Sequence, residues 1–274
     1  MTPELSLMLR RLLKPLIATL IKRGVGYIAM RDLLKQVYIE EALRCHDEQT
    51  PATDSTLSVM TGINRREVKR LRADIKTSPG EEKSAMTGVN MAARVVATWS
   101  SAAQFRDETG APRPLAVHGA DGKDFDSLLR VAKVDVRART IIGELERAGA
   151  VKMGDDDRLL LLRNSYTPSV PEEKMLFLSA NVGDHLRAAL SNLEGNTPPF
   201  IERALFQNRL SGEWLEGLRS HFARMAEQFL RDANEALLKE SVAGTDSPPP
   251  ALSAAPKRMR LGVYYYETDA DDAP

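Results

Sequence analysis

The sequence predicts a mainly α-helical protein with a helix-turn-helix domain, a winged-helix-like domain with a small β-hairpin, and a C-terminal helical region. Three observations support this class. Apolar residues recur at helical spacing over most of the 274 residues. Gly62 separates two short helical patterns. Two short apolar runs flank the turn-forming sequence Gly154-Asp155-Asp156-Asp157, which is typical of a hairpin.

The first domain is expected over residues 1–78 and begins with two amphipathic helices. The first is predicted over 5–23 as a core helix with a charged face, and Pro15 is expected to kink or split it. The second is predicted over 27–43. Its inward-facing residues are predicted to be Leu33, Leu34, Val37 and Tyr38.

The segment from Asp54 to Ile75 has the spacing of a helix-turn-helix, with helices predicted over 55–60 and 65–75. Gly62 permits the tight turn, where φ is expected to be positive. The side chains expected to pack around this turn are Leu57, Ile63, Val68 and Leu71.

The start of helix 65–75 carries a predicted cap and a basic exposed face. Asn64 is a good N-cap, and Glu67 completes a pair that resembles a capping box. The first turn of such a helix reaches base edges in a major groove, and Arg70 and Arg72 are expected to contact phosphates. The candidate DNA-binding residues are Asn64, Arg65, Arg66, Lys69, Arg70 and Arg72, of which Arg65, Arg66 and Lys69 are expected to contact bases.

The charge distribution favours the same segment. The whole chain is neutral, with 38 Lys or Arg and 38 Asp or Glu, which argues against a uniformly basic coat. Residues 1–76 nevertheless carry 14 Lys or Arg against 9 Asp or Glu. A basic helix face can also be simply solvated, or can contact a protein.

The second domain is expected over residues 85–168 and has a weaker winged-helix pattern. Arg137 and Arg139 are secondary candidates for DNA contact. The acidic residues 155–157 lie at the tip of the hairpin, where they would repel phosphate, so a structural or protein-contact role is favoured. The predicted elements are helices at 89–99, 125–132 and 136–148, a loop at 106–124, and strands at 151–153 and 159–162.

Residues 169–240 are predicted to be helical with a break at 195–199, and residues 241–274 are expected to form a flexible tail with a tyrosine-rich, strand-like segment. The apolar stripe of the last helix forms either a homodimer interface through residues 211–238 or a surface packed on its own domain. The stripe comprises Trp214, Leu218, Phe222, Met225, Phe229 and Ala233.

Enzymatic and metal chemistry have no support in the sequence. The four histidines lack metal-ligand spacing, the single Cys45 excludes an intrachain disulfide, and phosphate-binding glycine motifs are absent. We therefore expect no catalytic residues, no metal and no cofactor. No segment approaches the roughly 20 apolar residues of a membrane span, and we expect no membrane partner and a cytoplasmic location.

The chain resembles a bacterial protein family of unknown function. The segments that carry the resemblance are LLKPLIATLIKRGVGYIAMRDLLKQVYIEEA, LSVMTGINRREVKRLR, ARVVATWSS followed by GAPRPL, ELERAGAV and GVYYYE. The resemblance covers most of the chain and implies a helix-turn-helix protein. The short helix-turn-helix stretch is also similar to bacterial transcription regulators.

The sequence therefore predicts a protein that binds double-stranded DNA, a transcriptional regulator that reads the major groove with helix 65–75. The alternative is a protein–protein interaction module that uses winged-helix folds without binding nucleic acid.

Overall fold

The computed structural model describes residues 1–46, 52–77, 81–119, 121–163, 166, 168, 170–208, 210–243 and 257–268; the side chains of residues 76–77, 81–90 and 240–243 are not described. The chain divides into two compact units, Met1–Glu81 and Glu82–Ala273.

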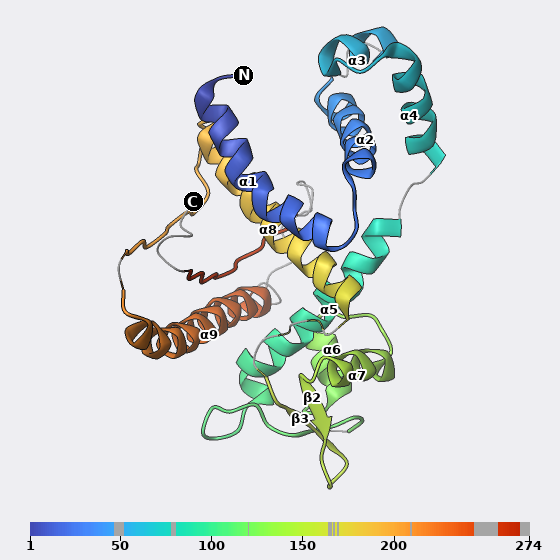
Figure 1. Cartoon of the computed structure of the whole chain (residues 1–274). Coiled ribbons are helices and arrows are strands. Elements are labelled where there is room, and N and C mark those ends of the chain that lie inside the picture. Colours follow the sequence, from blue (N-terminus) through green and yellow to red (C-terminus); the bar gives the residue numbers. More distant parts are fainter. Residues whose placement is uncertain are drawn as a thin grey trace. The chain divides into compact units, whose positions relative to one another are not determined.

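The fold is mainly helical, with one small antiparallel sheet (Figure 1). In the first unit the helices are α1 (Pro3–Lys22), α2 (Tyr27–Cys45), α3 (Asp54–Thr61) and α4 (Arg65–Thr77). The second unit contains α5 (Glu81–Ser101), the 3₁₀ helix η1 (Ala103–Phe105), β1 (Leu115–Ala116), α6 (Phe125–Val131), α7 (Ala138–Arg147), β2 (Val151–Met153), β3 (Arg158–Leu161), α8 (Pro171–Leu193) and α9 (Gly212–Ala243).

Helix α1 is continuous, so a split at Pro15, one of the two expected outcomes, is wrong. The side chain of Thr2 caps the helix by accepting from the amide of Leu5 at 3.3 Å. Proline keeps a helical φ but lacks the N–H, so Pro15 removes one backbone hydrogen bond from the helix. The expectation of a core helix is also wrong, because no residue of α1 is buried.

Helix α2 contributes two buried residues, Ile39 and Ala42, to the core of the first unit. The inward-facing set predicted for this helix is wrong. The short helices α3 and α4 cover only one strip of α2. That strip contains Ile39 and Ala42, which come after the predicted residues in the sequence. The four predicted residues, Leu33, Leu34, Val37 and Tyr38, are between 41% and 59% exposed.

The second unit is built around a three-stranded sheet in the order β1-β3-β2. Strand β3 lies in the centre, where Leu159 pairs with Leu115 of β1 and Met153 of β2. The hairpin between β2 and β3 turns at Asp157, whose φ is +56°. The predicted hairpin is confirmed, whereas β1 lies in the stretch that is predicted to be a loop.

Helices α5, α6 and α7 and the sheet enclose the larger core. The ring of Trp99 packs edge-on against Phe125, with centroids 5.9 Å apart. The indole N–H donates to the carbonyl of Arg113 at 3.0 Å, so the largest side chain of this core is buried with its polar group satisfied. The fully buried large residues also include Phe105, Leu115, Leu128, Ile141, Leu145 and Leu159.

The helical region after the sheet consists of α8 and α9. The non-helical segment between the two helices is longer than the break predicted at 195–199. Asn192 explains part of the difference, because its side chain accepts from the amide of Phe200 at 2.8 Å and donates to the Phe200 carbonyl at 3.1 Å. This holds the chain beside the end of α8. Helix α9 contacts α5 through Asn234, which donates to the carbonyl of Ala97 at 3.0 Å.

The described part of the tail, residues 257–268, contains neither helix nor strand. The aromatic rings of Tyr264 and Tyr265 contact helices α8 and α9. The strand-like character predicted for the tyrosine run is therefore not realised in this segment. The rest of the predicted tail beyond α9 lies outside the described residues.

Candidate nucleic-acid interface

Helices α3 and α4 are joined by a turn that is fixed by local hydrogen bonds. Gly62 ends α3 with φ +72°, and its amide donates to the carbonyl of Ser58 at 2.9 Å. The Ser58 hydroxyl donates to the carbonyl of Ile63 at 2.7 Å, which ties the far side of the turn back to α3. The positive φ predicted for Gly62 is confirmed.

Asn64 caps α4, as predicted. Its side-chain oxygen accepts from the amide of Arg66 at 2.9 Å, and its carbonyl accepts from the amides of Glu67 and Val68. This cap satisfies donors that would otherwise be unpaired at the start of the helix. Asn64 therefore positions α4, and its side-chain oxygen is occupied.

Glu67 has a different partner from the one that the capping-box pattern predicts. Its carboxylate accepts from Nζ of Lys35 at 2.8 Å, which joins α4 to α2. Both side chains are about 30% exposed, at 28% for Lys35 and 30% for Glu67. A tertiary ion pair has thus replaced the local cap contact.

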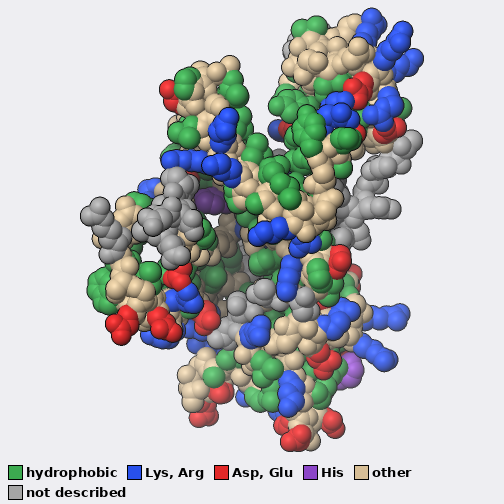
Figure 2. All heavy atoms as spheres, viewed as in Figure 1, with side chains coloured by type: hydrophobic (Ala, Val, Ile, Leu, Met, Phe, Trp, Pro, Cys, Tyr) green, Lys and Arg blue, Asp and Glu red, His purple; other side chains and the backbone are tan. Residues whose placement is uncertain are grey.

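The two faces of α4 differ sharply in burial. Val68 and Leu71 are 0% and 4% exposed and pack with Leu57, Ile39 and Ala42. Arg65, Arg66 and Lys69 are exposed, and none of them forms an ion pair with another described residue. Figure 2 shows Lys and Arg side chains gathered over the α3–α4 region.

Arg70 and Arg72, the predicted phosphate contacts, are paired within the chain. Arg72 lies 2.5 Å from the carboxylate of Asp54, and both side chains are 26% exposed. Arg70 pairs with Asp74 at 3.0 Å but remains 60% exposed. Sequence reasoning missed Lys35 and Asp54, because charges 32 and 18 residues away from their partners give no local signal.

The secondary candidates Arg137 and Arg139 lie at the start of α7 in the second unit. Arg137 is the N-cap residue and makes no side-chain cap bond, and both guanidinium groups are exposed. The opposite face of α7 is anchored in the larger core by Ile141, Ile142 and Leu145. The two candidate sets belong to different units.

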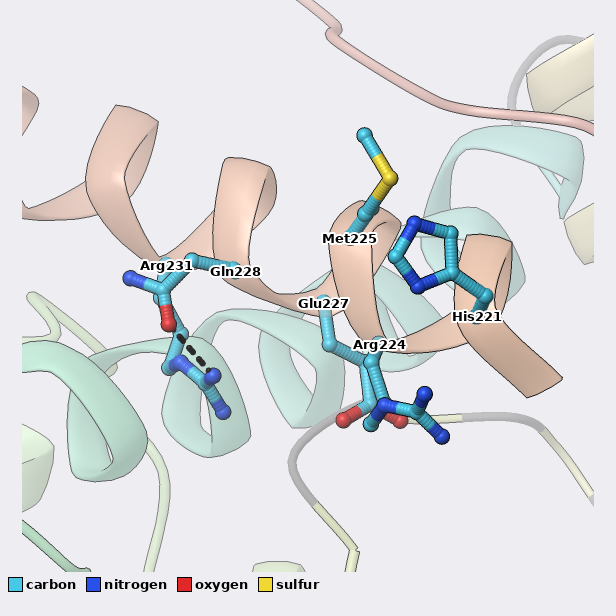
Figure 3. Close-up of a pocket in the computed structure, with 6 residues that line it drawn as sticks. All are labelled: His221, Arg224, Met225, Glu227, Gln228 and Arg231. Carbon is cyan, nitrogen blue, oxygen red and sulfur yellow. Dashed lines mark hydrogen bonds between the residues drawn. The ribbon is translucent and has the colours of Figure 1, made fainter.

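Two hollows in the described structure have no converging catalytic groups. One, of about 290 Å³, lies in the first unit between α2 and the end of α3, beside Tyr38, Thr61 and Ile63. The other, of about 490 Å³, follows α9 and is drawn in Figure 3, where Arg231 donates to Gln228. All six residues that line the second hollow come from this one helix, so we assign it no ligand.

Within the residues described, no three His, Cys, Asp or Glu side chains come together as a metal-binding group. Among the helices that the structure describes, none is both long enough and apolar enough to cross a bilayer.

The architecture thus defines the class of the protein, a mainly helical chain with a small three-stranded antiparallel sheet. The sequence model of DUF6502, a family of unknown function, matches residues 3–273, and the chain belongs to this family. No curated protein and no solved structure matches the chain.

Proposed function

We propose that this protein binds double-stranded DNA as a transcriptional regulator and inserts α4 into the major groove. The observation that carries the proposal is the charge at the start of α4. Arg65, Arg66 and Lys69 project from the exposed face without ionic partners among the described residues, while Val68 and Leu71 fix the opposite face. Helix-turn-helix proteins contact bases with the corresponding first turn.

The arrangement of α2, α3 and α4 supports this proposal. Two short helices joined at a left-handed glycine and packed on a third helix are typical of a helix-turn-helix. Within this motif, we assign base contact to Arg65, Arg66 and Lys69, because Arg and Lys match the acceptors of guanine. Asn64 and Arg72 position the helix, and we assign phosphate contact to Arg70, which is 60% exposed.

For the second unit we propose a winged-helix fold with a structural role. Its order of helix, strand, two helices and a hairpin, with β1 paired to β3, is the order of a winged helix. The hairpin tip carries Asp155, Asp156 and Asp157, which disfavour contact with phosphate. DNA contact through Arg137 and Arg139, which are exposed, is the alternative role for this unit.

The test is a binding titration with labelled random duplex DNA at several salt concentrations. We expect log affinity to fall linearly with log salt for the wild type, because phosphate contacts release counterions. The triple variant R65A/R66A/K69A should lose most of the affinity, because the exposed face of α4 loses three positive charges. On a selected specific site, R65A or R66A alone should cost about 1–3 kcal/mol.

The matched control is R10A/K14A/K22A, which removes three exposed cations from α1 in the same unit. It should retain the affinity and the slope of the wild type. Equal losses in the two triple variants would mean that general charge, and not α4, drives binding. Absence of binding at low salt would overturn the proposal and favour a protein-docking module.

A further inference from the structure

The described tail segment, residues 257–268, is held on α8 by a pair of arginines. Arg258 makes a bidentate contact with the carboxylate of Asp184, at 2.7 and 2.8 Å. Arg260 donates through Nε to the same carboxylate at 2.7 Å, and through a second nitrogen to the side chain of Asn181 at 2.9 Å. Two planar guanidinium groups on one carboxylate form a specific arrangement, because each direction of approach is fixed.

Asp184 is only 16% exposed beneath these arginines. The hydrogen bonds from Arg258 and Arg260 hold the pKa of its carboxyl well below its ordinary value, although burial acts in the opposite direction. The carboxylate is therefore ionised at neutral pH. Arg187, on the same helix, approaches it at 3.2 Å.

The aromatic end of the segment contacts both helices. Tyr264 lies against the ring of His185 on α8, with centroids 5.5 Å apart, and Tyr265 lies against Phe222 on α9, at 5.9 Å. Glu267 forms an ion pair with Arg219 of α9 and also accepts from the Tyr265 hydroxyl. Neighbouring tyrosines thus contact different helices, and the segment bridges α8 and α9 (Figure 1).

We propose that the α8–α9 surface is a peptide-binding site and that residues 257–268 of the same chain are its ligand. The site accepts two arginines separated by one residue through Asp184 and Asn181, two adjacent aromatic rings through His185 and Phe222, and a carboxylate through Arg219. When this site is occupied, the segment holds α9 and α8 together by contacting both helices.

The connection favours the chain's own segment over that of a second copy. Thirteen residues separate Ala243 from Lys257, and this length of chain spans at most about 50 Å. A ligand tethered by so short a connection has an effective concentration in the millimolar range. A free peptide must therefore compete with the tethered one.

The test uses the full chain and a fluorescein-labelled peptide with the sequence of residues 257–268. In the wild type the site is occupied, so the peptide should bind weakly. The variant R258A/R260A weakens the internal ligand, and we expect it to bind the labelled peptide at least tenfold more tightly. Adding D184N to that variant should abolish the gain, whereas D232N, which removes a carboxylate from α9, should leave it intact. A scrambled peptide of the same composition controls for general attraction.

Circular dichroism checks that each variant keeps its helix content. Equal peptide binding by the wild type and by R258A/R260A would overturn the internal occupancy. A gain that survives D184N would overturn the site. If light scattering shows a wild-type dimer that R258A/R260A converts to monomer, the segment belongs to a second copy and the proposal of an internal ligand fails. None of these measurements involves DNA, so their outcome does not depend on whether the protein binds DNA.

Discussion

At the scale of single residues, Gly62 shows how one position determines the path of the chain. A Cβ at this residue would meet no atom within 4 Å, so the constraint is not a matter of space. The constraint is its φ of +72°, which costs an ordinary L-residue about 1–2 kcal/mol. The sequence was sufficient to predict this residue, because the requirement is local.

Buried Tyr166 and partly exposed Glu144 form a pair that the sequence could not predict. The tyrosine hydroxyl donates to the Glu144 carboxylate at 2.8 Å, across 22 residues of chain. Burial raises the pKa of Glu144, and the hydrogen bond from Tyr166 partly offsets this effect. Burial and the neighbouring carboxylate also raise the pKa of Tyr166.

Replacing Tyr166 with Phe tests the pair through its pH dependence. We expect Y166F to lower the free energy of unfolding at pH 7 by about 1–2 kcal/mol, because the carboxylate loses a donor. Since the raised pKa makes the folded state bind the proton more tightly, stability falls as pH rises from the ordinary pKa of Glu through the folded value. The variant raises that pKa further, so its deficit should shrink at pH 4.

Urea unfolding at pH 4 and pH 7 measures this difference, with Y38F as the control because Tyr38 is 59% exposed. A deficit of the same size at both pH values would show that Glu144 is not involved.

At the scale of elements, periodicity predicted where helices form better than which faces they bury. The predicted helix over 27–43 corresponds to α2, and that over 65–75 corresponds to α4. An apolar stripe can pack against any neighbouring apolar surface, however. The pattern alone therefore does not identify the helix or strand that covers the stripe, or how much of the stripe is covered. Strand β1 has only two residues, which is too short for an alternating pattern, and it forms because β3 offers a free edge.

The same reasoning explains what could be predicted of the candidate interface. The cap at Asn64 and the basic first turn of α4 depend on neighbours in sequence, and both were predictable. The ion pairs of Glu67 with Lys35 and of Arg72 with Asp54 depend on packing between helices. These ion pairs could be identified only from the packed positions of α2, α3 and α4.

Helix α9 retains an exposed apolar edge, which favours the first of the two roles expected for its apolar stripe, a homodimer interface through residues 211–238. Trp214, Met225 and Phe229 are 65%, 56% and 49% exposed and recur on one side of the helix. Dimeric helix-turn-helix proteins bind two half-sites about 34–36 Å apart. We expect the wild type to sediment as a dimer and M225E/F229E to shift to monomer, because a buried charge disfavours the interface.

The control for this prediction is L193E, which places one such charge at a residue that is 72% exposed at the end of α8 and outside this interface. It should sediment as the wild type does. Loss of the dimer in L193E as well would point to unfolding or to another surface.

At the scale of the whole molecule, the chain has two cores of very different size. Among the described residues, the core of the first unit contains five buried residues, whereas that of the second contains nineteen. Because the stability of a unit grows with the apolar surface that it buries, the unit that carries the proposed recognition helix is expected to be the less stable of the two. Amides of α2, α3 and α4 should therefore exchange with solvent faster than those of α6 and α7.

Core variants separate the two units experimentally. Leu57 and Leu128 are both fully buried, one in each core, and truncation of such a residue to Ala costs about 2–5 kcal/mol. Hydrogen exchange followed by mass spectrometry should show that L57A removes protection from α2–α4 and leaves α6 and α7 unchanged, while L128A does the reverse. Loss of protection throughout the chain in either variant would mean that the two cores unfold as one. Independent unfolding would instead mean that the proposed DNA-binding unit folds without support from the larger core, so L57A should abolish DNA binding while the second unit remains folded.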